Sequence, residues 1–269
     1  MIELPTRVAT IGAGNMAEAF LSGLARAGLA ADHLIAADPD PVRRKHLAET
    51  LGIRVTADNT EAVRSADVAV IAVKPTHVEA ALTGLPQKDA PLYLSIVAGR
   101  TVSWLRGVLG DEARIVRSMP NTPALIGAGI TALAVDGRAA TDDLDRAEAV
   151  LAAVGRVVRV PESQLDAVTG LSGSGPAYVF LFIESLTDAG VREGLPIEVA
   201  RALAAETVLG AARLLRESGE DPAVLRKRVT SPAGTTAAGL ASLEAAGFRA
   251  ALLGAVRSAT ERSRELASS

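Results

Sequence analysis

The chain has 269 residues, of which 49% are hydrophobic and 22% charged, and its 28 lysines and arginines nearly balance its 31 aspartates and glutamates. This length allows one large domain or two of ordinary size, and the apolar fraction excludes a disordered chain. The near-neutral charge and scarce aromatic residues argue against nucleic-acid binding, and the absence of cysteine excludes disulfides, thiolate nucleophiles and cysteine-ligated metals.

The first part of the chain alternates short β-branched runs with alanine-rich stretches of helical length. This pattern is typical of a parallel sheet with crossover helices. Strands are predicted over residues 7–11, 33–37, 54–56, 68–73, 92–96, 114–117, 130–135 and 157–160, and helices over 16–27 and 41–51. The run 68–73 is apolar without alternation, as expected of a central strand covered on both faces. An α/β domain with a doubly wound sheet is therefore predicted over residues 1–160.

After Pro161 the strand signal almost disappears, and helices with proline near their starts and glycine at their ends replace it. Helices are predicted over residues 176–189, 196–218, 222–228, 235–246 and 248–267, the first of them ending at Gly190. Residues 178–183 are apolar on every side, so their helix must be enclosed, which in so small a helical unit requires a second subunit. We expect an all-helical C-terminal dimerisation domain over residues 161–269.

Neither a signal peptide nor a membrane-spanning run is recognisable in this sequence. The first residues lack a basic segment followed by a long apolar one, and the strand-like run 68–73 is too short to cross a bilayer. We therefore expect a cytoplasmic protein with no membrane partner. Three scattered histidines do not suggest a metal site, so the composition favours chemistry that a bound cofactor supplies.

The segment from Gly12 to Ala17 carries the first motif, because it joins a predicted strand to a predicted helix. Gly12 allows a tight turn, Gly14 lets a diphosphate approach the backbone, and Ala17 replaces the third glycine of a dinucleotide fingerprint. Free N–H groups at the start of the helix favour an anion. The alternative is a glycine turn in another α/β fold.

Asp38 ends the second predicted strand, about 20 residues beyond the fingerprint, where an acidic residue usually holds the ribose of NAD and repels the 2′-phosphate of NADP. Arg43 and Arg44 follow closely. They either reach a 2′-phosphate or form a solvated helix face. The choice between NADH and NADPH stays open.

Further loops at the ends of predicted strands contain Asn59, Lys74 and residues 119–123. Open α/β sheets bind ligands at this edge, so Lys74 is interpreted as lining a cofactor rather than as a surface charge. Two clusters of small residues, 171–178 and 229–236, open predicted helices. Such helix starts are either carboxylate sites or plain caps.

Taken together, residues 11–17, 72–75, 119–123, 166–178 and 229–236 resemble the pyrroline-5-carboxylate reductase family of proline biosynthesis over essentially the whole chain. The resemblance implies an N-terminal Rossmann domain and a helical domain that interlocks two subunits into a homodimer, with dimers commonly assembled into decamers. It also implies reduction of 1-pyrroline-5-carboxylate to L-proline by hydride transfer from NADPH or NADH to a cyclic iminium.

The resemblance also assigns residues to the site. The cofactor is held by Gly12, Ala13, Gly14, Asn15, Met16, Ala17, Asp38, Asn59, Ala72, Val73, Lys74, Pro75, Ile96, Val97, Ala98 and Arg228. The substrate, a cyclic imine carboxylate, is held by Glu162, Ser231, Gly234, Thr235 and Thr236. Thr236 is the catalytic candidate, placed to hydrogen-bond the imine nitrogen, and neither a general acid nor a metal is expected. Ala233 departs from a glycine frequent in the family.

Three other interpretations are weaker. A β-hydroxyacid dehydrogenase needs a lysine where this chain has Val179. A non-catalytic NAD(P)-sensing protein leaves the substrate-loop match unexplained, and a structural dimer module leaves the glycine fingerprint unexplained. Reduction of a different cyclic imine stays open as an alternative activity of the same family.

Overall fold

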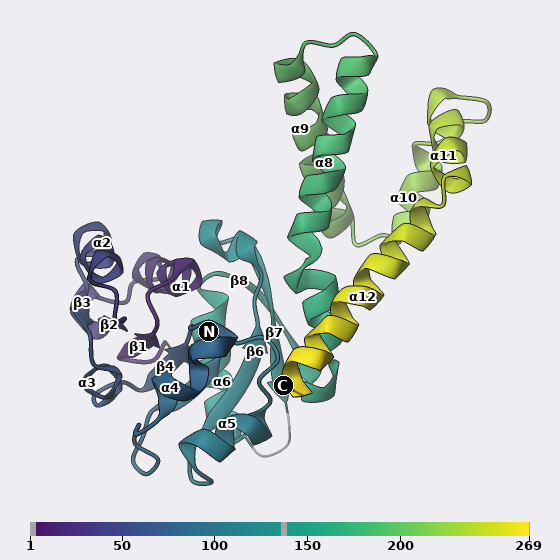
Figure 1. Ribbon diagram of the computed structural model, residues 1–269. Helices are drawn as coiled ribbons and strands as arrows, with labels where there is room; N and C mark the ends of the chain where they lie inside the picture. Colours follow the sequence, from purple (N-terminus) through teal and green to yellow (C-terminus); the bar gives the residue numbers. More distant parts are fainter. Residues whose placement is uncertain (1–3, 136–138, 269) are drawn as a thin grey trace. The chain divides into compact units, whose positions relative to one another are not determined.

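The computed structural model describes residues 4–135 and 139–268, which form two compact units (Figure 1). The first unit holds the chain up to Ser174 together with the segment from Arg257 onward, and the second holds Gly175–Val256. The first unit extends beyond residue 160 because Leu165 and Val168 pack against Ala132 and Ala134 of the sheet.

The first unit is built on a mixed sheet that, within the described residues, has eight strands. They are β1 Val8–Ile11, β2 Leu34–Ala37, β3 Arg54–Thr56, β4 Val68–Ile71, β5 Leu92–Ser95, β6 Ile115–Met119, β7 Gly129–Val135 and β8 Gly155–Pro161. Their order is β3-β2-β1-β4-β5-β6-β7-β8, and every neighbouring pair is parallel except β6 and β7. The first six follow the Rossmann order, so the predicted fold class and all eight predicted strands are confirmed.

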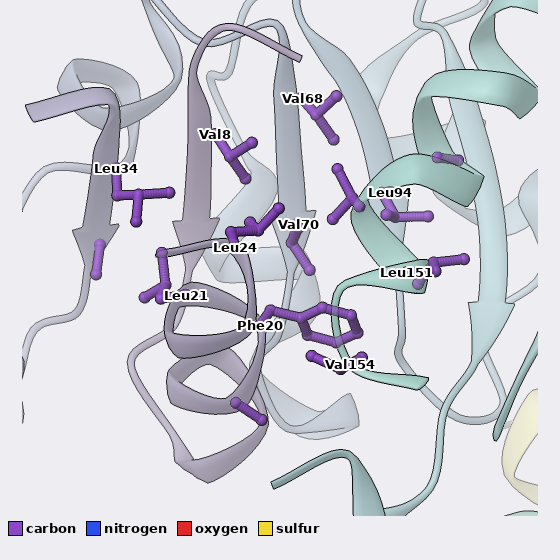
Figure 2. Close-up of a cluster of buried hydrophobic side chains, with 14 of the residues drawn as sticks. Val8, Phe20, Leu21, Leu24, Leu34, Val68, Val70, Leu94, Leu151 and Val154 are labelled. Atoms are coloured by element: carbon purple, nitrogen blue, oxygen red, sulfur yellow. The ribbon is translucent and has the colours of Figure 1, made fainter. Parts of the chain in front are cut away.

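Helices cover both faces of this sheet. They are α1 Asn15–Arg26, α2 Pro41–Leu51, α3 Asn59–Val63, α4 Val78–Leu82, α5 Val102–Leu109, α6 Thr141–Ala152 and α7 Leu165–Val168. Short 3₁₀ turns lie at Ala31–His33, Pro75–His77, Thr122–Ile126 and Glu162–Gln164. Because successive strand residues point to opposite faces, Val68 and Val70 join the cluster of α1 and α6, whereas Ala69 and Ile71 join that of α3, α4 and α5 (Figure 2). This explains why the β4 run is apolar without alternation.

The second unit is entirely helical in its described residues. Its helices are α8 Gly175–Arg192, α9 Ile197–Ser218, α10 Pro222–Arg228 and α11 Thr235–Ala245, and α12 Phe248–Ser268 begins there and ends in the first unit. Gly219 ends α9 in the left-handed conformation, with φ 66°, and the Asp221 side chain caps α10 by accepting a hydrogen bond from the Ala223 N–H at 2.7 Å. These predicted helix boundaries are confirmed.

The predicted end of α8 at Gly190 is wrong, because the helix continues to Arg192. A Cβ atom built on Gly190 would lie 3.0 Å from the Cβ of Ala200. Glycine is therefore used here for close packing of α8 against α9, and Gly194, with φ 95°, follows the helix end.

Residues 171–178 lead into α8 as predicted, but they do so through an irregular turn. Thr169–Gly173 form a π-helical turn after α7, and the Ser174 N–H donates to the Thr169 carbonyl at 2.8 Å. The Ser174 N–H before α8 is therefore already paired, and whether this cluster also binds a carboxylate stays a prediction. Pro176 has no N–H to continue an α-helical ladder, which is consistent with the irregular turn before it.

Few side chains of the second unit are buried within this chain. Among its described residues only Thr187, Ala200 and Ala204 are buried, whereas Phe180, Leu181 and Leu253 are 65%, 63% and 73% exposed. The predicted enclosure of α8 is therefore not achieved within one chain. In the described part of the chain no single helix is long and apolar enough to cross a membrane. Only α11 and α12 together, bent by 51°, pass that test of length and composition.

Candidate active site

The glycine turn between β1 and α1 forms the centre of the predicted cofactor site. Gly12 has φ 100° and donates its N–H to the Ala37 carbonyl at 2.7 Å, and a Cβ on it would lie 2.7 Å from the Ala72 oxygen. Gly14 is the N-cap residue of α1 and has an extended conformation. Because it has no side chain, no side-chain hydrogen bond caps the helix. No atom lies within 4 Å of a Cβ built on Gly14. The turn therefore leaves open space at the start of α1. The first N–H groups of a helix have no partners within it, so this space suits a diphosphate.

The neighbouring strand ends bring the next predicted residues to the same edge. The Ala72 N–H donates to the Ile11 carbonyl at 2.8 Å, and the Ile96 N–H to the Ile71 carbonyl at 3.2 Å. Because β1, β4 and β5 are adjacent and parallel, residues 72–75 and 96–98 follow their strands at the edge where Gly12 lies. Here the strand order reverses, which is where open α/β sheets bind ligands.

Asp38 follows β2, and Asn59 begins α3 after β3, at that edge as well. The Asp38 carboxylate accepts hydrogen bonds from the Ala13 N–H at 2.7 Å and the Asp40 N–H at 2.9 Å. The Asn59 amide donates to the Ala81 carbonyl at 2.9 Å and so ties α3 to α4. The first unit thus brings together every predicted cofactor residue except Arg228.

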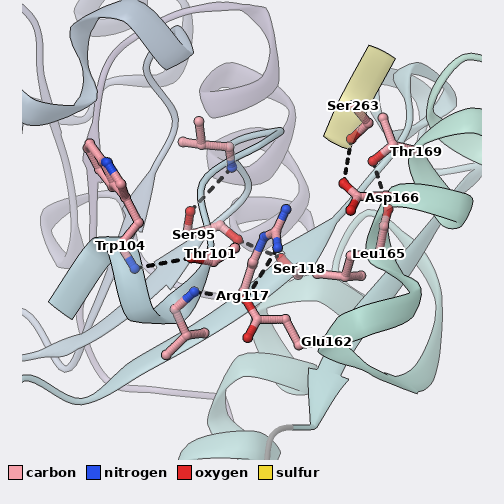
Figure 3. Close-up of polar contacts among 12 residues, drawn as sticks. Ser95, Thr101, Trp104, Arg117, Ser118, Glu162, Leu165, Asp166, Thr169 and Ser263 are labelled. Carbon is pink, nitrogen blue, oxygen red and sulfur yellow. Dashed lines mark hydrogen bonds and ion pairs between the residues drawn. The ribbon is translucent and has the colours of Figure 1, made fainter. Parts of the chain in front are cut away.

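Glu162 lies at the start of the 3₁₀ turn after β8 and belongs to a partly buried polar network (Figure 3). Its Oε1 accepts from the Val102 N–H at 2.8 Å and from Nη1 of Arg117 at 3.2 Å, and Arg117 is only 4% exposed. Glu162 therefore holds the start of α5 and compensates a buried guanidinium. Its predicted contact with substrate stays a prediction.

The predicted substrate loop and Arg228 lie in the second unit. The Gly234 N–H donates to the Ser231 carbonyl at 3.1 Å, closing a turn in which Ala233 has φ 55°. This position of the turn normally takes glycine, so Ala233 carries backbone strain. Thr235 and Thr236 are exposed at the start of α11, and Gly234 before them provides no side-chain cap. Arg228 ends α10 and pairs with Glu220.

Two family models match the chain in the order of its two parts. Residues 7–99 match the model described as NADP oxidoreductase, coenzyme F420-dependent, and residues 162–266 match pyrroline-5-carboxylate reductase dimerisation. A curated pyrroline-5-carboxylate reductase of Synechocystis is 48% identical over 95% of this chain and 96% of its own. The chain belongs to the pyrroline-5-carboxylate reductase family.

Solved structures of the family support this membership. A pyrroline-5-carboxylate reductase of Coxiella burnetii is 35% identical with a TM-score of 0.89, covering 97% of this chain and 98% of its own. The Plasmodium falciparum enzyme with NADP bound is 31% identical with a TM-score of 0.88, covering 99% of both chains. The family expected from the sequence is confirmed.

Sequence reasoning did not find the ion pair between buried Arg117 and partly exposed Glu162, nor the role of Arg43, whose Nε donates to the Ala13 carbonyl at 2.8 Å. For the ion pair of Arg117, the available signal was an arginine inside the apolar strand β6, because a buried charge needs a partner of opposite charge. Within residues 4–135 and 139–268, no group of three or more histidines and carboxylates is arranged to hold a metal ion.

Proposed function

We propose that the protein reduces 1-pyrroline-5-carboxylate to L-proline with NADPH or NADH. The observation that carries this proposal is the open glycine turn at the reversal of strand order, in a chain 48% identical to a curated reductase of that name. When bound, the nicotinamide cofactor supplies the hydride.

In the first unit, the residues of the glycine turn bind the cofactor. The N–H groups at the start of α1 compensate the diphosphate charge, with residues 13 and 15–17 beside it. Residues 72–75 and 96–98 line the remainder of the cofactor at the edges of β4 and β5. In the second unit, Arg228 lies near the nicotinamide.

The start of α11 binds the substrate. Backbone N–H groups from Thr235 onward and the hydroxyls of Ser231 and Thr235 hold the carboxylate. Gly234 contributes by starting the helix without a side-chain cap, which leaves these donors free for an anion. The Thr236 hydroxyl hydrogen-bonds the imine nitrogen, and Glu162 contacts the substrate ring. A protonated imine is already electrophilic, so these residues act by orientation and need no protein nucleophile.

The enzyme works as a homodimer through its C-terminal helices. The match to the reductase dimerisation model and the exposed apolar side chains of α8, α9 and α12 support this assembly. Assembly of dimers into decamers and a cytoplasmic location are proposed on the family resemblance and the composition.

The test is cofactor oxidation by the purified protein, followed by absorbance, with 1-pyrroline-5-carboxylate and each reduced cofactor. We expect turnover, and we expect Thr236→Ala to lower kcat/KM about 10- to 100-fold through loss of one hydrogen bond to a charged group. Thr83→Ala is the control, because the exposed Thr83 hydroxyl donates only to the Glu79 carbonyl at 2.8 Å.

Two results would contradict the proposal. Binding of cofactor without substrate-dependent oxidation would favour the NAD(P)-sensing alternative. Unchanged kcat and KM in Thr236→Ala would mean that the substrate lies elsewhere.

A further inference from the structure

The carboxylate of Asp38 is held in one position beside the glycine turn. Oδ2 accepts from the Ala13 N–H at 2.7 Å, and Oδ1 accepts from the Asp40 N–H at 2.9 Å. A carboxylate oxygen offers about two acceptor sites, so each still has capacity for another donor. Any ribose bound after β2 therefore meets a fixed group that accepts hydrogen bonds and donates none.

The two arginines that follow Asp38 both donate to backbone carbonyls around this site. Arg43 donates through Nε to the Ala13 carbonyl at 2.8 Å, and its Nη2 lies 3.3 Å from Oε2 of Glu18. Arg44 donates through Nη1 to the carbonyls of Asp38 and Pro39, at 2.6 and 2.8 Å. These contacts direct the guanidinium of Arg43 to the glycine turn and that of Arg44 to the backbone of the loop after β2, and Glu18 offsets the charge of Arg43.

We infer that this enzyme prefers NADH to NADPH and that Asp38 is the residue that sets the preference. The inference rests on the proposed function, because it concerns the same cofactor. The 2′-hydroxyl of NADH can donate a hydrogen bond to the carboxylate, whereas the 2′-phosphate of NADPH brings a second anion against it.

The preference for NADH is a property of this chain's own residues and is not set by the cofactor bound to a relative. The Plasmodium falciparum structure holds NADP, yet that chain is only 31% identical to this one. The preference follows from the side chain at the end of β2 and from where its neighbouring arginines point, and both are properties of these residues.

The experiment measures dissociation constants of NADH and NADPH without substrate, by titration calorimetry, for the wild type and for Asp38→Asn. We expect the wild type to bind NADH at least about tenfold more tightly, and Asp38→Asn to shift the ratio of the two constants toward NADPH by a similar factor. Asp38→Ser is a second variant in case the asparagine disturbs the turn, because its hydroxyl can still accept an N–H.

Asp40→Asn is the matched control. It removes the same charge two residues away, and asparagine can still cap α2 as Asp40 does by accepting the Val42 N–H at 2.8 Å. A wild type that binds NADPH as tightly as NADH would overturn the inference. An equal shift of the ratio in the Asp38 and Asp40 variants would also overturn it, because the effect would then be general charge. Failure to bind either cofactor would instead overturn the proposed function.

Discussion

At the scale of single residues, Gly12 and Gly14 of the same turn differ in what the surrounding structure demands of them. Gly12 has φ 100° and lies against the Ala72 carbonyl, so folding itself needs glycine there. Gly14 has φ −73°, which any residue adopts, and the space beside its Cα is open. Glycine is common at a helix N-cap, and the proposed approach of the diphosphate adds a second reason for it at this position.

The two glycines therefore respond differently to the same substitution. We expect Gly12→Ala to lower the free energy of unfolding by about 2–4 kcal/mol through backbone strain and overlap. We expect Gly14→Ala to change it by less than about 1 kcal/mol, yet to weaken NADH binding at least about tenfold because the methyl group takes the space of the diphosphate. Urea denaturation and cofactor titration measure the two effects, and normal NADH binding by Gly14→Ala would place the diphosphate elsewhere.

Tyr93 gives the protein a specific response to alkaline pH. Its ring is fully buried on β5, its hydroxyl donates to the Pro86 carbonyl at 2.8 Å, and burial raises its pKa to about 12. In the unfolded chain the Tyr93 hydroxyl ionises near pH 10, before it does so in the folded protein. Its contribution to the free energy of unfolding is therefore complete below that pH and is lost as the pH rises toward 12. The loss reaches about 1 kcal/mol by about pH 11.

Tyr93→Phe tests this effect by urea denaturation at about pH 9 and about pH 11. We expect the variant to be less stable by about 1 kcal/mol at the lower pH, through the lost hydrogen bond, and to lose less stability than the wild type between the two. An equal alkaline loss in both proteins would assign the effect to other groups.

At the scale of elements, the helices of the second unit are positioned by small residues at their contacts. A Cβ on Gly190 of α8 would lie 3.0 Å from the Cβ of Ala200 on α9, and Ala200 and Ala204 are among the few buried residues of this unit. Close approach of the two helices replaces the large apolar side chains that usually fill such a contact.

We expect Gly190→Val to lower the free energy of unfolding by about 1–3 kcal/mol, although valine forms helix better than glycine, because the added methyl groups separate α8 from α9. Gly107→Val is the control, since Gly107 lies inside α5 with no atom within 4 Å of a built Cβ. Thermal unfolding followed by circular dichroism measures both. A Gly190→Val protein as stable as the control would show that this contact is not tight.

At the scale of the whole molecule, the two units differ in how they are stabilised. The first unit buries complete apolar layers on both faces of its sheet. The second exposes large side chains along α8, α9 and α12, including Phe180 and Leu253. A helical unit without a core of its own needs apolar surface from another chain.

Leu253→Asp tests this requirement. We expect the variant to dissociate, with a dimer dissociation constant raised by at least about 100-fold, because twofold symmetry removes the leucine from both copies. Val42→Asp on α2 is the control. Val42 is 72% exposed and Leu253 is 73% exposed, but Val42 belongs to the first unit and Leu253 to the second. Size-exclusion chromatography with light scattering measures the assembly. A wild type that is monomeric, or a Leu253→Asp variant that stays fully dimeric, would contradict the expectation.

Much of the architecture follows from local sequence patterns. The apolar runs predict all eight strands, and the turn chemistry at Gly12, Gly219 and Asp221 predicts where helices start and end. The parallel arrangement of the strands then brings Ala72, Val97 and Asp38 to one edge of the sheet. These features are predictable because they depend on the conformational preferences of a few consecutive residues and on a common rule for α/β sheets.

The tertiary structure alone decided what distant side chains do to one another. It showed that Gly190 packs a helix instead of ending it, that buried Arg117 pairs with Glu162, and that Asp38 accepts a hydrogen bond from the glycine turn. The partner in each of these contacts could not be identified from the sequence, because it depends on how closely separate segments approach after folding. The composition, with no cysteine and three histidines, indicated cofactor chemistry, and the open turn at Gly14 showed where the chain has room for a cofactor.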